Sequence, residues 1–192
     1  MSQHETLIGN SKGHLIPVDS KKLILINILL QKSQLMIEAE KLLWKNLQEA
    51  FPGELREPLK PSAIIRFMKR RKIALADLSS PGNLLEAIRE SNITEILFTG
   101  SFNAGSLFCL FYESVLGQQV TRNIRQQRGT ILDASFLGRP VWLTVLYSAS
   151  GNANVGIARS QQFQEIRHQL DEDRPVHDFR IRSYREKFEL PA

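Results

Sequence analysis

The residues best suited to chemistry in this sequence are small and polar, and they follow one strongly apolar stretch. Residues 141–147 are mostly apolar with β-branched Val and Thr among them, which predicts a buried strand. Residues 148–154, here termed the site segment, then read Ser-Ala-Ser-Gly-Asn-Ala-Asn. Their hydroxyls, carboxamides and backbone N–H groups can hydrogen-bond a phosphate or a base edge without carrying charge. Ligands of open α/β sheets bind beyond the carboxyl ends of the strands, so we expect a site here.

Other residue types argue against several common kinds of site. Cys109 is the only cysteine, which excludes disulfides within the chain and Cys-based zinc sites, and its apolar surroundings predict a buried thiol. We expect no metal and no cofactor, because the histidines have no partners at ligand spacing: His4, His14, His168 and His177. A glycine turn at Gly100 and Gly105 could favour an anion, but it lacks the Lys of a P-loop. Tight packing of a helix on a strand explains these glycines equally well.

The charge of the chain favours a polyanionic partner. The formal net charge is +5 and the isoelectric point is near 9.5. The basic residues gather in three clusters, namely Arg66, Lys69, Arg70, Arg71 and Lys72; Arg122, Arg125 and Arg128; and Arg174, Arg180, Arg182, Arg185 and Lys187. Such clusters form either solvated helix faces, the first also complementing a helix C-terminus, or a surface that follows phosphates. The sequence leaves both interpretations open.

Length and composition indicate one domain with a substantial core. The chain has 192 residues, of which 42% are hydrophobic. No apolar run approaches the roughly 18 residues that a membrane span needs, and the N-terminus lacks the layout of a signal peptide. We therefore expect a cytoplasmic protein without a membrane partner. The sequence leaves the oligomeric state open, with a monomer favoured. Residues 1–22 are expected to form an arm, and residues 23–192 a single domain.

Strands and helices are predicted to alternate along the chain. The strands are expected at residues 23–30, 73–78, 94–98, 130–137 and 141–147. The helices are expected at residues 33–51, 61–71, 80–92 and 104–115, from near Arg159 to Leu170, and at 177–188. The last helix should bury one face, made by His177, Ile181, Tyr184 and Phe188. This alternation predicts an α/β fold with a mainly parallel sheet.

Three stretches, taken together, carry a family resemblance. Residues 73–78 read Ile-Ala-Leu-Ala-Asp-Leu, residues 96–104 read Ile-Leu-Phe-Thr-Gly-Ser-Phe-Asn-Ala, and residues 146–154 read Leu-Tyr-Ser-Ala-Ser-Gly-Asn-Ala-Asn. In order and spacing, over about residues 20–170, the chain resembles the uracil-DNA glycosylase superfamily, especially its mismatch-specific and single-strand-selective branches. The third stretch is similar to the second signature loop of that family.

The resemblance implies a fold, a partner and an activity. The fold would be a three-layer α/β/α sandwich around a central, mainly parallel four-stranded sheet. The partner would be DNA, from which a uracil or mismatched base is flipped into a pocket and released by hydrolysis of its N-glycosidic bond, as in base excision repair. The resemblance places Phe98, Gly100, Phe102 and Tyr147 in the base pocket, and Ser148, Ser150, Gly151, Asn152 and Asn154 against DNA.

The chain departs from the family at the positions that perform the chemistry. The first signature of the family carries an Asn or Asp that activates water, whereas residues 27–32 here read Asn-Ile-Leu-Leu-Gln-Lys, without an acid. Asn27 and Gln31 are the residues left to position a water molecule. Two hypotheses follow: an active glycosylase, or a catalytically degenerate member that binds DNA or a nucleotide without cleavage. A nucleoside- or phosphate-handling enzyme of another type is disfavoured, because the chain lacks Asp/His clusters.

Overall fold

The computed structural model describes residues 14–15, 19–26, 41–77, 84–99, 108–109, 118–124, 130–132 and 139–189. The chain divides into two compact units. The first, termed the sheet unit, comprises Met1–Ala39 and Met68–Leu146, and the second, termed the helical unit, comprises Glu40–Phe67 and Tyr147–Ala192. Each unit contains its own cluster of buried apolar side chains. A single domain over residues 23–192 stays a prediction.

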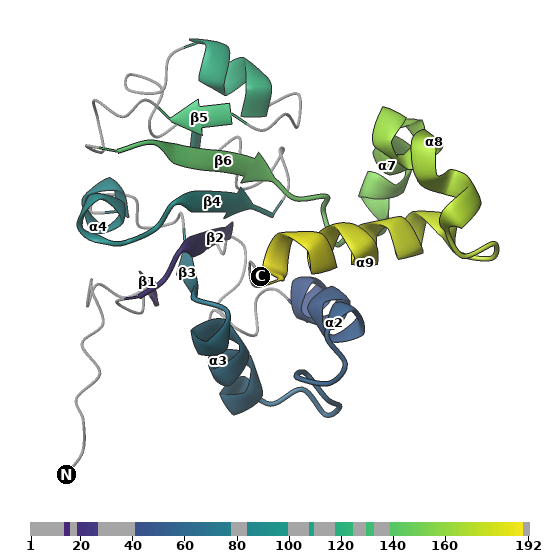
Figure 1. The fold of residues 1–192 in the computed structure, drawn as a ribbon, viewed down its shortest axis with the longest axis horizontal. Helices are drawn as coiled ribbons and strands as arrows, with labels where there is room; N and C mark the ends of the chain where they lie inside the picture. Colours follow the sequence, from purple (N-terminus) through teal and green to yellow (C-terminus); the bar gives the residue numbers. More distant parts are fainter. Residues whose placement is uncertain are drawn as a thin grey trace. The chain divides into compact units, whose positions relative to one another are not determined.

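A six-stranded sheet forms the centre of the sheet unit (Figure 1). Its strands lie in the order β1 (His14–Leu15), β3 (Ile73–Asp77), β2 (Lys22–Ile26), β4 (Glu95–Phe98), β6 (Val141–Val145) and β5 (Thr130–Leu132). The four central strands run parallel, and β1 and β5 pair antiparallel at the two edges. The predicted α/β class with four central parallel strands is therefore confirmed. The two edge strands enlarge the sheet, and β1 lies within the stretch that the sequence assigned to an arm.

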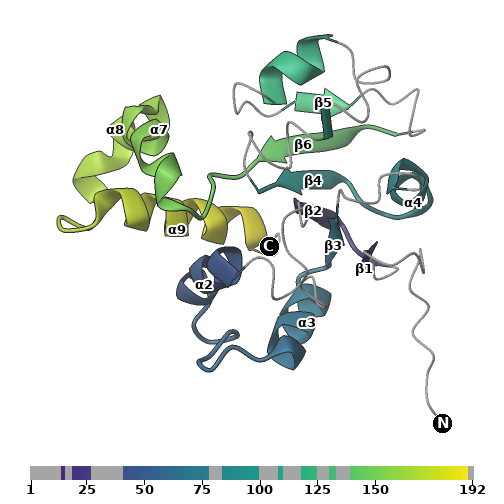
Figure 2. The same ribbon diagram turned by 180° about the vertical axis from the view of Figure 1, so that it is seen from behind.

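Both faces of the central strands are buried. On one face, Leu23, Leu25 and Phe98 join a cluster with Leu84 and Ile88 of α4 (Leu84–Glu90), which flanks the sheet (Figure 2). On the other face, Ile24, Leu75 and Leu97 are each fully buried. Continuous apolar runs such as residues 23–26 suit strands that are covered on both sides, as in a three-layer α/β sandwich.

The parallel strands end level with one another at one edge of the sheet. Leu25 of β2 pairs with Phe98 of β4, and Phe98 pairs with Val145 of β6. The ladder continues past the strand ends, because the Leu146 N–H donates to the Phe98 carbonyl at 2.9 Å. The chain thus leaves β2, β4 and β6 at the carboxyl edge, where open α/β sheets place their ligands.

The helical unit consists of α2 (Lys41–Ala50), the first residues of α3 (Pro61–Arg70) and the chain after β6. That last part forms η3 (Gly151–Ala153), α7 (Asn154–Arg159), α8 (Gln161–Ile166), η4 (Arg167–Gln169) and α9 (Pro175–Phe188). The helices predicted at 61–71 and 177–188 are confirmed to within two residues. The predicted helix start near Arg159 is wrong, because α7 already begins at Asn154.

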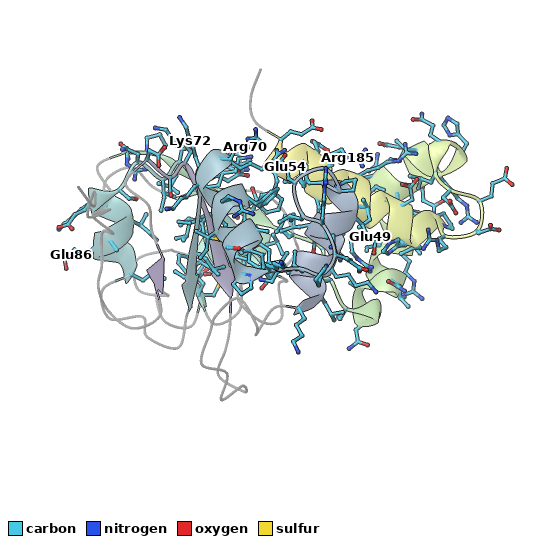
Figure 3. The ribbon with its side chains drawn as sticks, turned by 90° about the horizontal axis from the view of Figure 1, so that it is seen from below. Glu49, Glu54, Arg70, Lys72, Glu86 and Arg185 are labelled. Atoms are coloured by element: carbon cyan, nitrogen blue, oxygen red, sulfur yellow. The ribbon has the colours of Figure 1, made fainter. Side chains whose placement is uncertain are left out.

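Helix α9 organises this unit by packing on two sides. On one side its Arg185 Nε donates to the Ala50 carbonyl of α2 at 3.1 Å, and His177 Nε2 lies 2.6 Å from Glu49 Oε2. Figure 3 labels Arg185 of α9 and Glu49 of α2. On the other side Phe179 packs edge to face on Phe163 of α8, with ring centroids 5.5 Å apart. The buried surface of α9 is therefore wider than the single face that the sequence predicted. Phe179 and Arg180 are buried as well, whereas His177 is partly exposed.

Arg139 fastens the turn before β6 to the end of α4. Its guanidinium donates to the carbonyls of Ile88 and Ser91, each at 2.8 Å, and to the carbonyl of Ile93. Burial lowers the pKa of Arg139 from its ordinary value, but an arginine in a protein stays protonated. Arg139 thus brings a charged donor to three carbonyls at and beyond the helix end, of which the Ile88 carbonyl also accepts from the N–H and the hydroxyl of Ser91.

We predict that Arg139→Met lowers the free energy of unfolding by about 2 kcal/mol, because it removes charge-assisted hydrogen bonds to partly buried carbonyls. Urea denaturation measures this loss. The matched control is Arg122→Met at an exposed helical position of the same unit, which should change stability by less than about 0.5 kcal/mol. Equal losses in the two variants would contradict the role assigned to Arg139.

Candidate functional site

The site segment follows β6 directly and presents its polar groups to solvent. Leu146 is buried at the end of the strand, Ser148 and Ser150 are half-buried, and three further predicted residues are exposed: Gly151, Asn152 and Asn154. The sequence thus changes from core to surface within a few residues. Hydroxyl and carboxamide groups in this position are accessible to a ligand.

Hydrogen bonds within the segment give it a defined shape. The Ser148 and Ser150 hydroxyl oxygens lie 3.0 Å apart, and the Ser150 N–H donates to the Ser148 hydroxyl at 3.3 Å. The Ala153 N–H then donates to the Ser150 carbonyl at 3.2 Å, which begins η3. The expected loop over residues 148–154 is therefore a short turn that passes into helix at Gly151. Serine next to a glycine suits both a turn and a helix start, which explains the difference.

Two side chains of α9 hold this segment in place. The Tyr184 hydroxyl donates to the Tyr147 carbonyl at 2.5 Å. Arg180 Nη2 donates to Asn154 Oδ1 at 2.5 Å and approaches the Ser150 carbonyl at 3.4 Å. Residues four apart lie on the same face of a helix, so one turn of α9 fixes both ends of the segment.

Arg180 is a buried cation under the site segment. Its side chain is 4% exposed, and its Nε has no hydrogen-bond partner. Burial lowers the pKa of Arg180, an effect that Tyr184 partly opposes, and the guanidinium stays protonated. Among the residues that the structure describes, no carboxylate forms an ion pair with it. The segment therefore lies over a positive charge that is only partly compensated.

Two residues predicted for the base pocket belong to apolar cores. Phe98 is fully buried and packs on Phe108 with ring centroids 5.0 Å apart. The Tyr147 ring packs on Phe179 at 5.6 Å, and its hydroxyl lies 3.2 Å from Gln162 Oε1. The Phe98 ring is therefore closed to stacking by a base, whereas Tyr147 stays partly exposed. The other predicted residues lie outside the described parts of the chain: Asn27, Gln31, Gly100 and Phe102.

Sequence reasoning missed two residues of this site. Val155 is 60% exposed although apolar, and it directly follows the site segment at the start of α7. Arg180 was grouped with a basic tail, yet it is buried. Its position between Phe179 and Ile181, and four residues before Tyr184, was the available signal, because those neighbours face a core.

A metal cluster and a membrane-spanning helix were each looked for among the described residues. In the parts of the chain that the structure covers, no group of three His, Cys, Asp or Glu side chains could hold a metal ion. No helix among those residues has the length and apolar character to cross a membrane. Comparisons with models of known protein families and with curated proteins found no match. The function is therefore argued from the residues of the site.

We predict that Tyr184→Phe lowers the free energy of unfolding by about 1 kcal/mol, because the Tyr147 carbonyl loses a buried donor while the ring is kept. Amide exchange at residues 147–150 should become faster in the same variant. Tyr147→Phe is the control, because it removes only an exposed hydrogen bond to Gln162. Unchanged stability and exchange in Tyr184→Phe would show that α9 does not hold the segment.

Proposed function

We propose that this protein binds DNA through the site segment and acts as a uracil-DNA glycosylase-like enzyme on a uracil or mismatched base. The observation that carries the proposal is the site segment itself: neutral hydroxyl and amide groups lie over the buried charge of Arg180 and beside the exposed Val155. This combination fits a nucleic acid better than a small charged metabolite, which would need ionisable side chains on the surface of the segment.

Each part of the segment fits one element of DNA. Serine hydroxyls and backbone N–H groups hydrogen-bond phosphate oxygens, and asparagine carboxamides hydrogen-bond base edges. Apolar side chains inserted between base steps unstack them, and Val155 has the exposure that such a role requires. Unstacking a base is the step that precedes its capture by an enzyme that works on flipped bases.

Gly151 supports a close approach of the DNA backbone. A Cβ atom built at this position would meet no atom within 4 Å, and no left-handed φ requires glycine there. The fold therefore has no steric need for glycine at this exposed point. A ligand that lies against the segment would benefit from the missing side chain.

The glycosidic step makes demands that the site segment does not meet alone. Cleavage develops positive charge on the sugar and negative charge on the base, so the enzyme must position a water and stabilise the leaving base. Asn27 and Gln31 are the residues that the family resemblance offers for the water. Departure of the base before water attack would relax the need for a strong general base.

The second candidate function is DNA binding without cleavage. Residues 148–155 contain no ionisable side chain, and residues 27–32 contain no acid. Both observations favour a protein that has kept recognition and lost hydrolysis. The two candidates share the same DNA surface and differ only in the chemical step.

Incubation with oligonucleotides that contain uracil or a mismatch, followed by alkali, separates the candidates. We expect strand cleavage with the wild type, and loss of cleavage with retained binding in Asn27→Ala combined with Gln31→Ala. Intact strands at high enzyme excess, together with salt-sensitive binding by fluorescence anisotropy, would establish the second candidate. Absence of both cleavage and binding would contradict both functions.

We predict that Gly151→Ala weakens DNA binding several-fold while leaving the fold as stable as the wild type or slightly more stable. The added Cβ enters open space in the free protein and meets only the ligand. Gly53→Ala is the matched control, because its Cβ also meets nothing within 4 Å and lies away from the site segment in sequence. Equal DNA affinity of the two variants, measured by anisotropy, would remove Gly151 from the interface.

A further inference from the structure

Arg180 has a hydrogen-bond donor without an acceptor and a positive charge that is only partly compensated. Both of its hydrogen bonds to described residues come from Nη2, and its buried Nε has none. Arg139 provides the contrast within the same chain, because both of its Nη groups donate and together they reach three carbonyls. Arg139 therefore has more acceptors than Arg180, and they engage both of its Nη groups.

A buried guanidinium with few acceptors would be stabilised by an anion. Removing a guanidinium from water is costly unless a counter-charge or a full set of acceptors replaces the solvent. Arg180 receives one carboxamide oxygen and one long contact to a carbonyl, and no described carboxylate pairs with it. The charge of Arg180 is therefore only partly compensated within the protein, and its burial reduces screening by solvent.

We propose that Arg180 supplies the positive charge of a phosphate subsite whose hydrogen-bond donors are the hydroxyls of Ser148 and Ser150, and that this subsite takes one backbone phosphate of DNA. The inference rests on the proposed function for its ligand, but the subsite can be tested without DNA. Ser150 links the two parts of the proposed subsite. Its carbonyl lies 3.4 Å from Arg180 Nη2, and its hydroxyl oxygen lies 3.0 Å from that of Ser148.

Arg180→Gln tests the charge, with Arg182→Gln as control. Arg182 lies on the same helix, is 44% exposed and pairs with Asp178, so its replacement removes an equal charge away from the segment. Replacing Arg180 should weaken DNA binding several-fold. It should also make the plot of log binding constant against log salt concentration less steep by about 0.9, the value for one duplex phosphate contact. Arg182→Gln should leave the slope unchanged.

Asn154→Asp tests the same idea in a protein that keeps Arg180. The new carboxylate stands 2.5 Å from Arg180 Nη2 and neutralises the cation internally. This variant should have a higher melting temperature than the wild type and should no longer be stabilised by inorganic phosphate. Gln164→Glu adds the same charge at an exposed position of α8, outside the site segment, and is the control, which should keep the response to phosphate.

Thermal unfolding in phosphate, against chloride at equal ionic strength, completes the test. The wild type, Arg182→Gln and Gln164→Glu should gain stability in phosphate, and Arg180→Gln and Asn154→Asp should gain none. An equal gain in all five proteins, with equal salt slopes for Arg180→Gln and wild type, would overturn the subsite. A phosphate response that depends on Arg180, in a protein that does not bind DNA, would keep the subsite and overturn the proposed function.

Discussion

The burial of one guanidinium under a turn of small polar residues is the interaction on which the site depends. Arg180 cannot leave its position without exposing the core side chains beside it on α9, and it reaches the site segment at Ser150 and Asn154. Tyr184, one helical turn later, holds the residue that precedes the segment. The place of η3 and the start of α7 follow from these two anchors. A rigid helix thus carries a surface whose own residues have few apolar contacts.

The chain enters the site segment after β6, a central strand of the sheet. Four parallel strands bring their carboxyl ends to one edge, and the chain leaves β6 there, after the last backbone pairing between Leu146 and Phe98. Arg139 fixes the other end of β6 by joining the turn before it to α4. The strand that leads into the site segment is therefore held at both ends by hydrogen bonds that do not depend on the ligand.

The sequence predicted those parts of the fold that repeat a simple pattern. The β-branched runs of β2 and β6, and the apolar spacing of α3 and α9, identify the elements, because burial on a fixed period leaves a visible signal. Three features leave no such signal. β1 has two residues, the start of α7 is made of turn-forming residues, and Arg180 is a charged residue in a core position. Burial of a cation follows from tertiary contacts, which no local pattern encodes.

Hydrogen–deuterium exchange of the wild-type protein with and without a DNA duplex tests the central claim most directly. We expect DNA to slow amide exchange in residues 147–156, because the proposed contact would involve their backbone N–H groups. Exchange at the basic end of α3 and just after it, where Figure 3 labels Arg70 and Lys72, should stay unchanged. Protection confined to residues 66–72, with residues 147–156 unaffected by bound DNA, would contradict the account.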